Sequence, residues 1–373
     1  MKRLTFVIIC LEGAVLSFNV AAAAALIPSI AKDFVLSQFL IGKIVWIYML
    51  TYGLAALIYG PLVRKFDARK VELFCVFLFS LANLLVGSAR SVNALFLGRF
   101  FMGLFGASVI PLGIILIAKH INKEKRGKYI GMFFGFTFVA SLSGLFLSGV
   151  IHWRWIFLIP AISGFILWLV MYLYLPSFKE DLSVFKFNYF KVFNHRSLVK
   201  ILTYIFFISL VYHAVQQWLG VYFSTRLGLA QFAISMLITL TALSGIVGEF
   251  WGGFLTDSLG RIKIVNLGIV LMILSIFLLL LKLPLFALVL TMVIWGLGWT
   301  FNHVGLATML TDLPQEFMNE AASLNSGVRF ISGGVGMGLG GLIMSRSFSF
   351  GFIIFGCALF LLLIYGRFID IKR

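Results

Sequence analysis

The fold of this chain follows from one stretch, Gly253-Phe254-Leu255-Thr256-Asp257-Ser258-Leu259-Gly260-Arg261-Ile262-Lys263, which places an acid, a glycine and two cations between long apolar runs. A weaker copy, Gly60-Pro61-Leu62-Val63-Arg64-Lys65-Phe66-Asp67-Ala68-Arg69-Lys70, also stands between two apolar runs. A repeated segment indicates a repeated architecture. The two copies therefore predict a chain built as two similar halves.

The composition indicates a protein that resides in lipid. Of the 373 residues, 61% are hydrophobic and only 12% are charged, whereas soluble domains are about half apolar and a quarter charged. The net charge of +17 does not indicate nucleic-acid binding, because the cations lie in short loops between apolar runs. The three cysteines lie inside apolar runs, and their spacing predicts no metal site, disulfide framework or cofactor.

The apolar runs predict an all-α, polytopic membrane protein with twelve transmembrane helices. A span needs about 20 helical residues. The expected spans are 4–30, 39–63, 71–88, 94–118, 129–151, 155–175, 201–223, 231–256, 264–283, 285–310, 322–345 and 349–367. The N-terminus also resembles a secretory signal, but Glu12 interrupts its apolar part. The first run is long enough to span, so we expect a retained helix.

The predicted domains are a six-helix bundle at 1–175, a linker at 176–200 and a second six-helix bundle at 201–373. The linker mixes charged and aromatic residues, which favours an amphipathic segment on the membrane surface. Short loops on one side carry most of the Lys and Arg residues. The positive-inside rule then places both termini and the linker in the cytoplasm, with the chain in the inner or plasma membrane.

Five stretches together resemble the major facilitator superfamily. The two turn copies resemble its loop signature, Gly98-Arg99-Phe100-Phe101-Met102-Gly103 its fourth helix, and Trp153-Arg154-Trp155 the outer turn into its sixth. Gly144-Leu145-Phe146-Leu147-Ser148-Gly149 lies where the drug and metabolite antiporter branch has Gly-Pro-x-x-Gly-Gly, with Leu145 replacing the proline. The resemblance implies two pseudo-symmetric six-helix bundles that rock around a central cavity.

The turn copies differ in charge. The position at which the superfamily has an acid is Asp257 in the second copy, which also carries Arg261. In the first copy the same position is occupied by Arg64. The fold that the resemblance implies places the first turn beside the acidic loop before helix eleven, which ends at Glu320. We expect Arg64 and Glu320 to form a gating latch of reversed polarity. The alternative is that Arg64 is one more cytoplasmic cation.

Four charged residues lie most clearly inside the predicted spans, where a charge costs about 2.5–3.5 kcal/mol on insertion scales. They are Glu12, Arg99, Glu249 and Arg329. Low dielectric disfavours the charged form of a carboxyl group, so Glu12 is the first candidate for proton coupling, with Arg99 beside the proton path. The alternatives are a hydrogen-bonded structural acid and an arginine that reaches the interface. Glu249 and Arg329 are expected to form an ion pair, structural or gating.

Polar and aromatic residues recur at helical spacing in the helices that the resemblance assigns to the cavity. The candidate substrate residues are Asn19, Tyr212, His213, Gln216, Gln217, Trp295, Trp299, Asn302, His303 and Asn325. Amides and imidazoles orient a solute, and indole rings supply contact area. The alternative is polar packing between helices.

No stretch carries a catalytic constellation or a phosphate-binding loop, so we expect a transporter and no enzyme. The preferred interpretation is a monomeric secondary transporter that moves a small organic solute in exchange for protons, with efflux favoured. Two alternatives stay open. One is a uniporter or exchanger of a metabolite or organic anion without proton coupling, and the other is a membrane sensor of the same fold that transports nothing.

Overall fold

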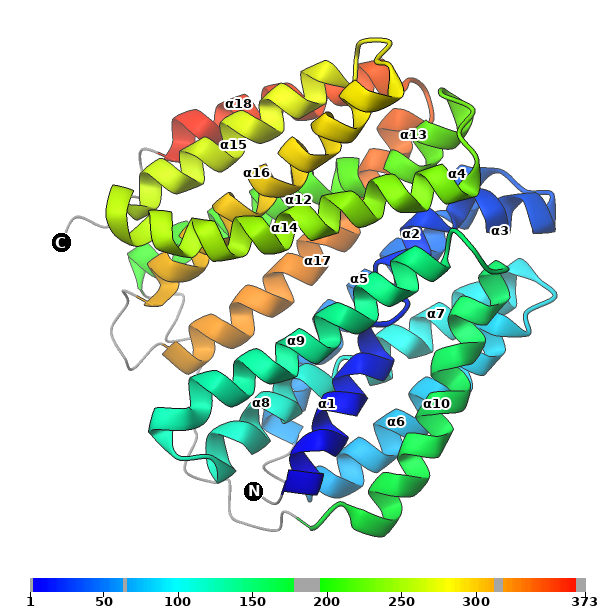
Figure 1. Cartoon of the computed structure of the whole chain (residues 1–373), viewed down its shortest axis with the longest axis vertical. Coiled ribbons are helices and arrows are strands. Elements are labelled where there is room, and N and C mark those ends of the chain that lie inside the picture. The colour runs from blue at the N-terminus through cyan, green and yellow to red at the C-terminus, as the bar shows by residue number, and fades with distance from the viewer. Residues whose placement is uncertain (1–2, 63–65, 178–194, 312–317, 367–373) are drawn as a thin grey trace. The chain divides into compact units, whose positions relative to one another are not determined.

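The structure, a computed structural model, describes residues 3–62, 66–177, 195–311 and 318–366, and these parts are helices joined by short connections (Figure 1). Contacts divide the chain into a first unit, residues 1–186 with 230–235, and a second unit, residues 187–229 with 236–373. Twelve helical stretches of the described residues are long and apolar enough to cross a membrane. The prediction of an all-α protein with twelve spans is confirmed.

The first unit contains ten helices in its described part. They are α1 (Arg3–Ser17), α2 (Ala22–Ala25), α3 (Ile27–Phe34), α4 (Gln38–Ile41), α5 (Lys43–Leu62), α6 (Ala68–Gly87), α7 (Val92–Gly106), α8 (Val109–His120), α9 (Lys123–Leu147) and α10 (Trp153–Tyr174). Helix α6 packs between α7 and α10, and α1 packs on α9 and α10.

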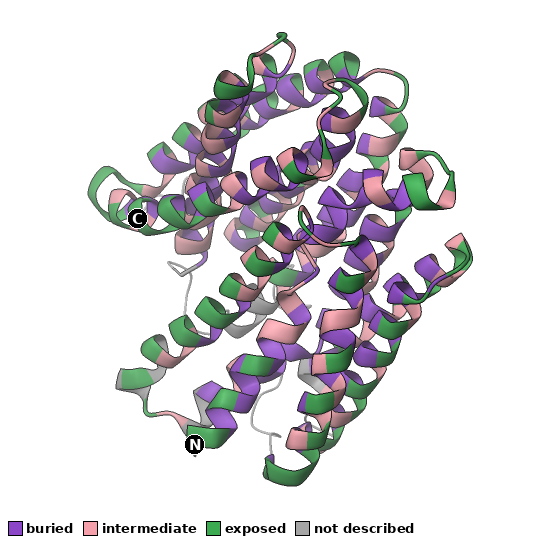
Figure 2. Ribbon diagram, turned by 45° about the vertical axis from the view of Figure 1, so that its right-hand side comes forward, coloured by how far each residue is buried: buried purple, intermediate pink, exposed green. Residues whose placement is uncertain are grey.

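The second unit contains seven helices in its described part. They are α12 (Arg196–Gln216), α13 (Leu219–Thr225), α14 (Gln231–Leu259), α15 (Arg261–Leu278), α16 (Leu285–Thr311), α17 (Met318–Met344) and α18 (Phe348–Tyr365). Helix α15 lies beside α16 and α18, and α12 lies beside α17 (Figure 1). Within each unit, buried residues face inward and exposed residues follow the outward faces of the helices (Figure 2).

Several helices begin at polar caps that the sequence supplies. Ser37, Ser91 and Ser347 each have an extended backbone, and each hydroxyl accepts a hydrogen bond from the backbone N–H three residues later. A serine in this position satisfies a donor that the first turn leaves free. These caps fix where α4, α7 and α18 start.

The two turn copies reverse the chain direction between consecutive spans with different backbone conformations. Gly260, between α14 and α15, has a φ of 96°, in the left-handed region that glycine tolerates best. At the matching place of the first copy, Asp67 caps α6 and accepts a hydrogen bond of 3.1 Å from the Arg69 N–H. The copies share a position between two spans but not a backbone conformation.

Three predicted spans are interrupted near their middles. The first is broken at residues 18–21 between α1 and α2, the fourth at 107–108 between α7 and α8, and the seventh at 217–218 between α12 and α13. Backbone N···O distances lengthen there, to 3.3 Å from Ala107 N and 3.4 Å from Ser108 N. The Ser108 hydroxyl donates to Phe105 O at 2.9 Å, which satisfies a carbonyl group beside the break.

Glycine allows α15 and α16 to pack closely in the second unit. A Cβ on Gly268 of α15 would lie 2.5 Å from Gly298 O, and a Cβ on Gly298 of α16 would lie 2.8 Å from Gly268 O. Real Cβ atoms do not approach backbone atoms this closely. The two backbones can therefore touch only because both positions lack side chains.

Candidate functional site

Two buried carboxyl groups lie together in the first unit. Glu12 on α1 is 2% exposed and Glu72 on α6 is 0% exposed. Their carboxyl groups are close enough to interact electrostatically. None of the four carboxyl oxygens has a hydrogen-bond partner among the described residues. Buried polar groups are normally hydrogen-bonded, so this carboxyl pair needs an explanation.

A thiol and a phenol border the carboxyl pair. Cys75, one turn after Glu72 on α6, interacts electrostatically with both carboxyl groups. Its Sγ donates to the hydroxyl of Tyr59 on α5 at 3.4 Å, and Tyr59 donates to Leu104 O at 2.9 Å. The hydroxyl is therefore committed to α7, and neither group neutralises a carboxylate.

Arg99 does not approach Glu12 as a partner. Its guanidinium is fully buried, and Nε donates to Ile44 O of α5 at 2.8 Å. It lies 4.3 Å from the Tyr48 ring centroid, and Nη2 has no partner among the described residues. Glu12 has no hydrogen-bond partner among the described residues either, so the two groups do not form a direct ion pair, and the placement of Arg99 beside a proton path stays a prediction.

Asn19 packs between helices. It follows α1, is fully buried, and its Nδ2 donates to the Oδ1 of Asn83 on α6 at 2.6 Å. This hydrogen bond joins the first span to α6, the same two spans that carry Glu12 and Glu72. This contact is of the kind that the polar-packing alternative describes, and the role of Asn19 in substrate binding stays a prediction.

The second unit contains a stack of aromatic rings. The ring of Tyr212 on α12 lies 3.8 Å from Trp299 and 5.4 Å from Trp295 of α16, centroid to centroid, with interplanar angles of 10° and 16°. Gln216 accepts a hydrogen bond of 2.6 Å from Trp295 Nε1 and so holds that indole. Sequence spacing placed these residues together correctly, and together they form a flat, rigid surface.

A buried arginine lies at one side of this stack. Arg329 on α17 is 9% exposed, and its guanidinium carbon is 5.6 Å from the Trp299 ring centroid. Its Nε donates to Asn325 Oδ1 at 2.9 Å, whereas Nη1 and Nη2 have no partner among the described residues. His213 Nδ1 lies 2.8 Å from Ser209 O, which makes this nitrogen the donor.

The expected ion pair of Glu249 with Arg329 is not a hydrogen-bonded one. Glu249 on α14 is about half exposed, and its Oε1 lies 2.9 Å from His303 Nδ1. This is an ion-pair distance, although the ring N–H is not directed at the oxygen in hydrogen-bond geometry. Glu249 and Arg329 interact electrostatically at longer range. The sequence identified the right two charges but missed His303 as the contacting group.

The remaining predicted residues divide into three groups. Asn302 is fully buried, and its Nδ2 donates to Val265 O of α15 at 3.4 Å, so it packs between helices and is not in the aromatic stack. Asp257 is exposed, Arg261 is partly exposed and Gln217 caps α12. Arg64 and the side chain of Glu320 lie outside the described residues.

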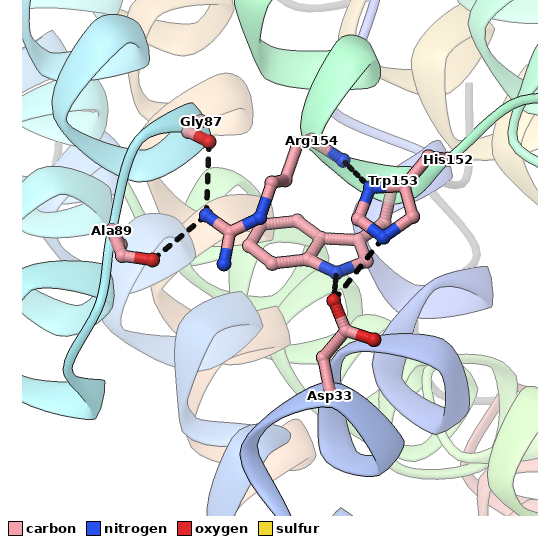
Figure 3. Close-up of polar contacts among 6 residues, drawn as sticks. All are labelled: Asp33, Gly87, Ala89, His152, Trp153 and Arg154. Carbon is pink, nitrogen blue, oxygen red and sulfur yellow. Dashed lines mark hydrogen bonds and ion pairs between the residues drawn. The ribbon is translucent and has the colours of Figure 1, made fainter.

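A cluster of polar contacts in the first unit includes Asp33 of α3 and residues 152–154 (Figure 3). Asp33 Oδ2 accepts a hydrogen bond of 2.7 Å from Trp153 Nε1 and lies 3.2 Å from His152 Nε2. The nearby Arg154 Nη1 donates to Gly87 O and Ala89 O at 3.1 and 2.7 Å. Arg154 thus ties the start of α10 to the end of α6, which is a structural role. Among the described residues, no group of three or more metal-ligating side chains occurs.

Comparison with known proteins gives a family match across most of the chain. The model of the family described as "Major Facilitator Superfamily" matches residues 9–337. The uncharacterized MFS-type transporter YbcL of Bacillus subtilis (strain 168) is 23% identical over 345 residues, which cover 89% of this chain and 88% of the relative.

Other relatives match over shorter stretches. The efflux pump hmp6 of Hypomyces subiculosus is 28% identical over 160 residues, covering 42% of this chain and 28% of the pump. Multidrug resistance protein 3 of Bacillus subtilis (strain 168) is 31% identical over 129 residues, covering 33% of this chain and 25% of that protein. The matches span about a third or less of the length of the fungal relatives.

Solved structures share the fold. A bacterial homolog of the human lysosomal transporter Spinster, in an inward-facing and occupied conformation, has a TM-score of 0.79 at 13% identity. The match covers 98% of this chain and 96% of the homolog. A mutant of the nucleoside transporter NupG has a TM-score of 0.75 at 15% identity, and that match covers 99% of this chain and 100% of the transporter. These identities support the fold alone.

Proposed function

The chain belongs to the Major Facilitator Superfamily, and we propose that it is a secondary transporter that exchanges a small organic solute for protons by alternating access. As a member of this transporter family it is not an enzyme. The family match does not favour a sensor that transports nothing. Proton coupling, the direction of transport and the residues involved are the proposed part.

The carboxyl pair carries the proposal. Two carboxylates side by side in an apolar interior repel each other, and an isolated buried charge is costly. The described residues supply Glu12 and Glu72 with no hydrogen-bond donor. At least one of the two therefore holds a proton, and the pair can take up or release that proton when its surroundings change. This property is what a proton-coupled transporter needs.

Efflux is the proposed direction. Relatives named as efflux pumps match the chain over part of its length. Leu145 stands where the antiporter branch has proline, so this segment offers no support of its own.

The proposal also covers the domains, the membrane topology and the gating contacts. We place the bundles at 1–175 and 201–373, joined by a cytoplasmic linker, with both termini in the cytoplasm and the monomer as the working unit. Arg64 and Glu320 remain the proposed latch, and Asp257 with Arg261 the corresponding turn of the second half. Reversal of both latch charges, by Arg64→Glu with Glu320→Arg, restores the transport that Arg64→Glu impairs.

A proteoliposome assay tests the function. The full chain is reconstituted with a pH-sensitive dye inside, and proton flux is recorded when a solute that stabilises the purified protein is added. Glu12→Gln and Glu72→Gln each reduce solute-driven proton flux at least tenfold and leave solute binding intact. Glu180→Gln, in the linker predicted from the sequence at 176–200, is the control and retains full flux.

The outcomes separate the alternatives. Solute flux without any proton movement in the unmodified protein indicates a uniporter or exchanger. Proton coupling that survives the double change of Glu12 and Glu72 excludes this pair as the proton site.

A further inference from the structure

The guanidinium of Arg329 is a buried cation with two free donor groups. Its Nε is used by Asn325, and Nη1 and Nη2 point to no acceptor in the described part of the chain. Burying a charged group without hydrogen bonds costs free energy, because the group loses its bonds to water and gains none from the protein. Two free N–H groups on one planar fork match the two oxygens of a carboxylate.

The position of this arginine is fixed by its neighbours. The backbone carbonyl of Arg329 accepts hydrogen bonds from Ser209 Oγ of α12 at 3.1 Å and from Ser332 Oγ at 3.2 Å. Asn325, one turn earlier on α17, holds Nε. The guanidinium is therefore held in place before any ligand binds, which lowers the entropy cost of binding.

The acid that interacts electrostatically with Arg329 does not occupy the fork. Glu249 interacts electrostatically with Arg329, but its carboxylate is about half exposed and contacts His303. An incoming anion therefore does not have to displace a bound carboxylate from Nη1 and Nη2.

The aromatic stack supplies the second half of a binding site. Trp299 lies near both the guanidinium and the ring of Tyr212, and Tyr212 is stacked in parallel on both tryptophans. Tyr212, Trp299 and Asn325 are each partly exposed, so their surfaces are not used up by packing. Parallel rings beside a cation suit a flat apolar body that carries one negative charge.

We propose that Arg329, Tyr212 and Trp299 bind an organic monocarboxylate with a planar apolar body, with the buried Trp295 supporting Tyr212 from within the unit. The inference rests on the proposed transport function and names its substrate class. The carboxylate accepts hydrogen bonds from Nη1 and Nη2, and the planar body lies against the exposed ring surface.

Thermal stabilisation of the full chain in detergent tests this site. The probes are benzoate and indole-3-acetate, their primary amides, and phenyl phosphate. Each carboxylate binds at least tenfold more tightly than its amide, and indole-3-acetate binds more tightly than benzoate. Equal binding of acid and amide, or a preference for phenyl phosphate over benzoate, overturns the proposal without the need for any variant.

Variants then locate the binding. Arg329→Gln removes the preference for acid over amide, and Arg329→Lys, which keeps the charge but not the fork, retains only part of it. Arg346→Gln, an exposed arginine of the same unit, leaves the preference unchanged. A preference that persists in Arg329→Gln overturns the assignment.

Failure of the site and failure of the function are distinguishable. Carboxylate binding in detergent without flux in proteoliposomes contradicts the transport function and leaves the site standing. Proton-coupled flux of neutral solutes, with no preference for carboxylates, supports the function and overturns the site.

Discussion

Replacing Arg99 by methionine tests whether this buried cation stabilises the first unit. Methionine has a similar length and no charge. The change removes the 2.8 Å hydrogen bond to Ile44 O and the contact with Tyr48 at 4.3 Å. A hydrogen bond to a charged group contributes about 1.5–3 kcal/mol, and a desolvated cation–π contact about 2 kcal/mol. The loss is therefore roughly 4 kcal/mol.

Removing the buried charge of Arg99 recovers a free energy of similar size. Burying a charge costs several kcal/mol, and uncharged replacements of similar volume are often neutral or stabilising. The unsatisfied Nη2 adds about 1–3 kcal/mol to that cost. The two sides cancel, so we expect Arg99→Met to change the unfolding free energy by only about 1 kcal/mol.

We expect Arg99→Lys, unlike Arg99→Met, to destabilise the protein. Lysine keeps the cost of the buried charge, but it lacks the planar group that bonds Ile44 O while lying over Tyr48. We expect a loss of about 2–4 kcal/mol. Unfolding of each variant in mild detergent, followed by denaturant titration, gives the order. A methionine variant less stable than the lysine variant refutes the reasoning, whatever its effect on transport.

Three other changes probe the packing. Asn19→Ala and Asn83→Ala form a double-mutant cycle, for which we expect a coupling energy of about 0.6 kcal/mol and at most about 1.7 kcal/mol. Denaturant unfolding measures this energy, and a value of zero would contradict the 2.6 Å hydrogen bond. Gly260→Ala destabilises by about 1–2 kcal/mol because its φ is 96°, and a melting temperature equal to that of the wild type argues against this backbone. Gly268→Ala lowers the melting temperature because its Cβ would lie 2.5 Å from Gly298 O. The matched control Gly338→Ala, with nothing within 4 Å of its Cβ, does not, and equal effects of the two changes would contradict the close α15–α16 contact.

The sequence predicted the spans because a lipid environment demands long apolar helices, and loops of the kind seen at Gly260 interrupt them visibly. It did not predict the breaks inside three spans, since no proline or run of glycines marks residues 18–21 or 217–218. These breaks depend on how each helix packs, which apolar length does not encode.

The same limit applies to the sites. Helical spacing grouped Tyr212 with Gln216, and Trp295 with Trp299, because residues three or four apart share a face. Spacing does not say which neighbour that face meets, so it could not show that Asn19 and Asn302 hydrogen-bond to α6 and α15. Glu72 was missed because it lies only five residues into α6 and resembles the charged end of a span.

The interrupted spans bear on how each unit can deform. A continuous helix resists bending because curvature must stretch its ladder of backbone bonds, whereas at Ala107 and Ser108 that ladder is already long. Tilting α8 against α7 at this point costs little, so strain concentrates in one or two residues and leaves the flanking turns rigid. Both the backbone N–H and the hydroxyl of Ser108 donate to the Phe105 carbonyl, so this residue keeps the end of α7 attached to the start of α8.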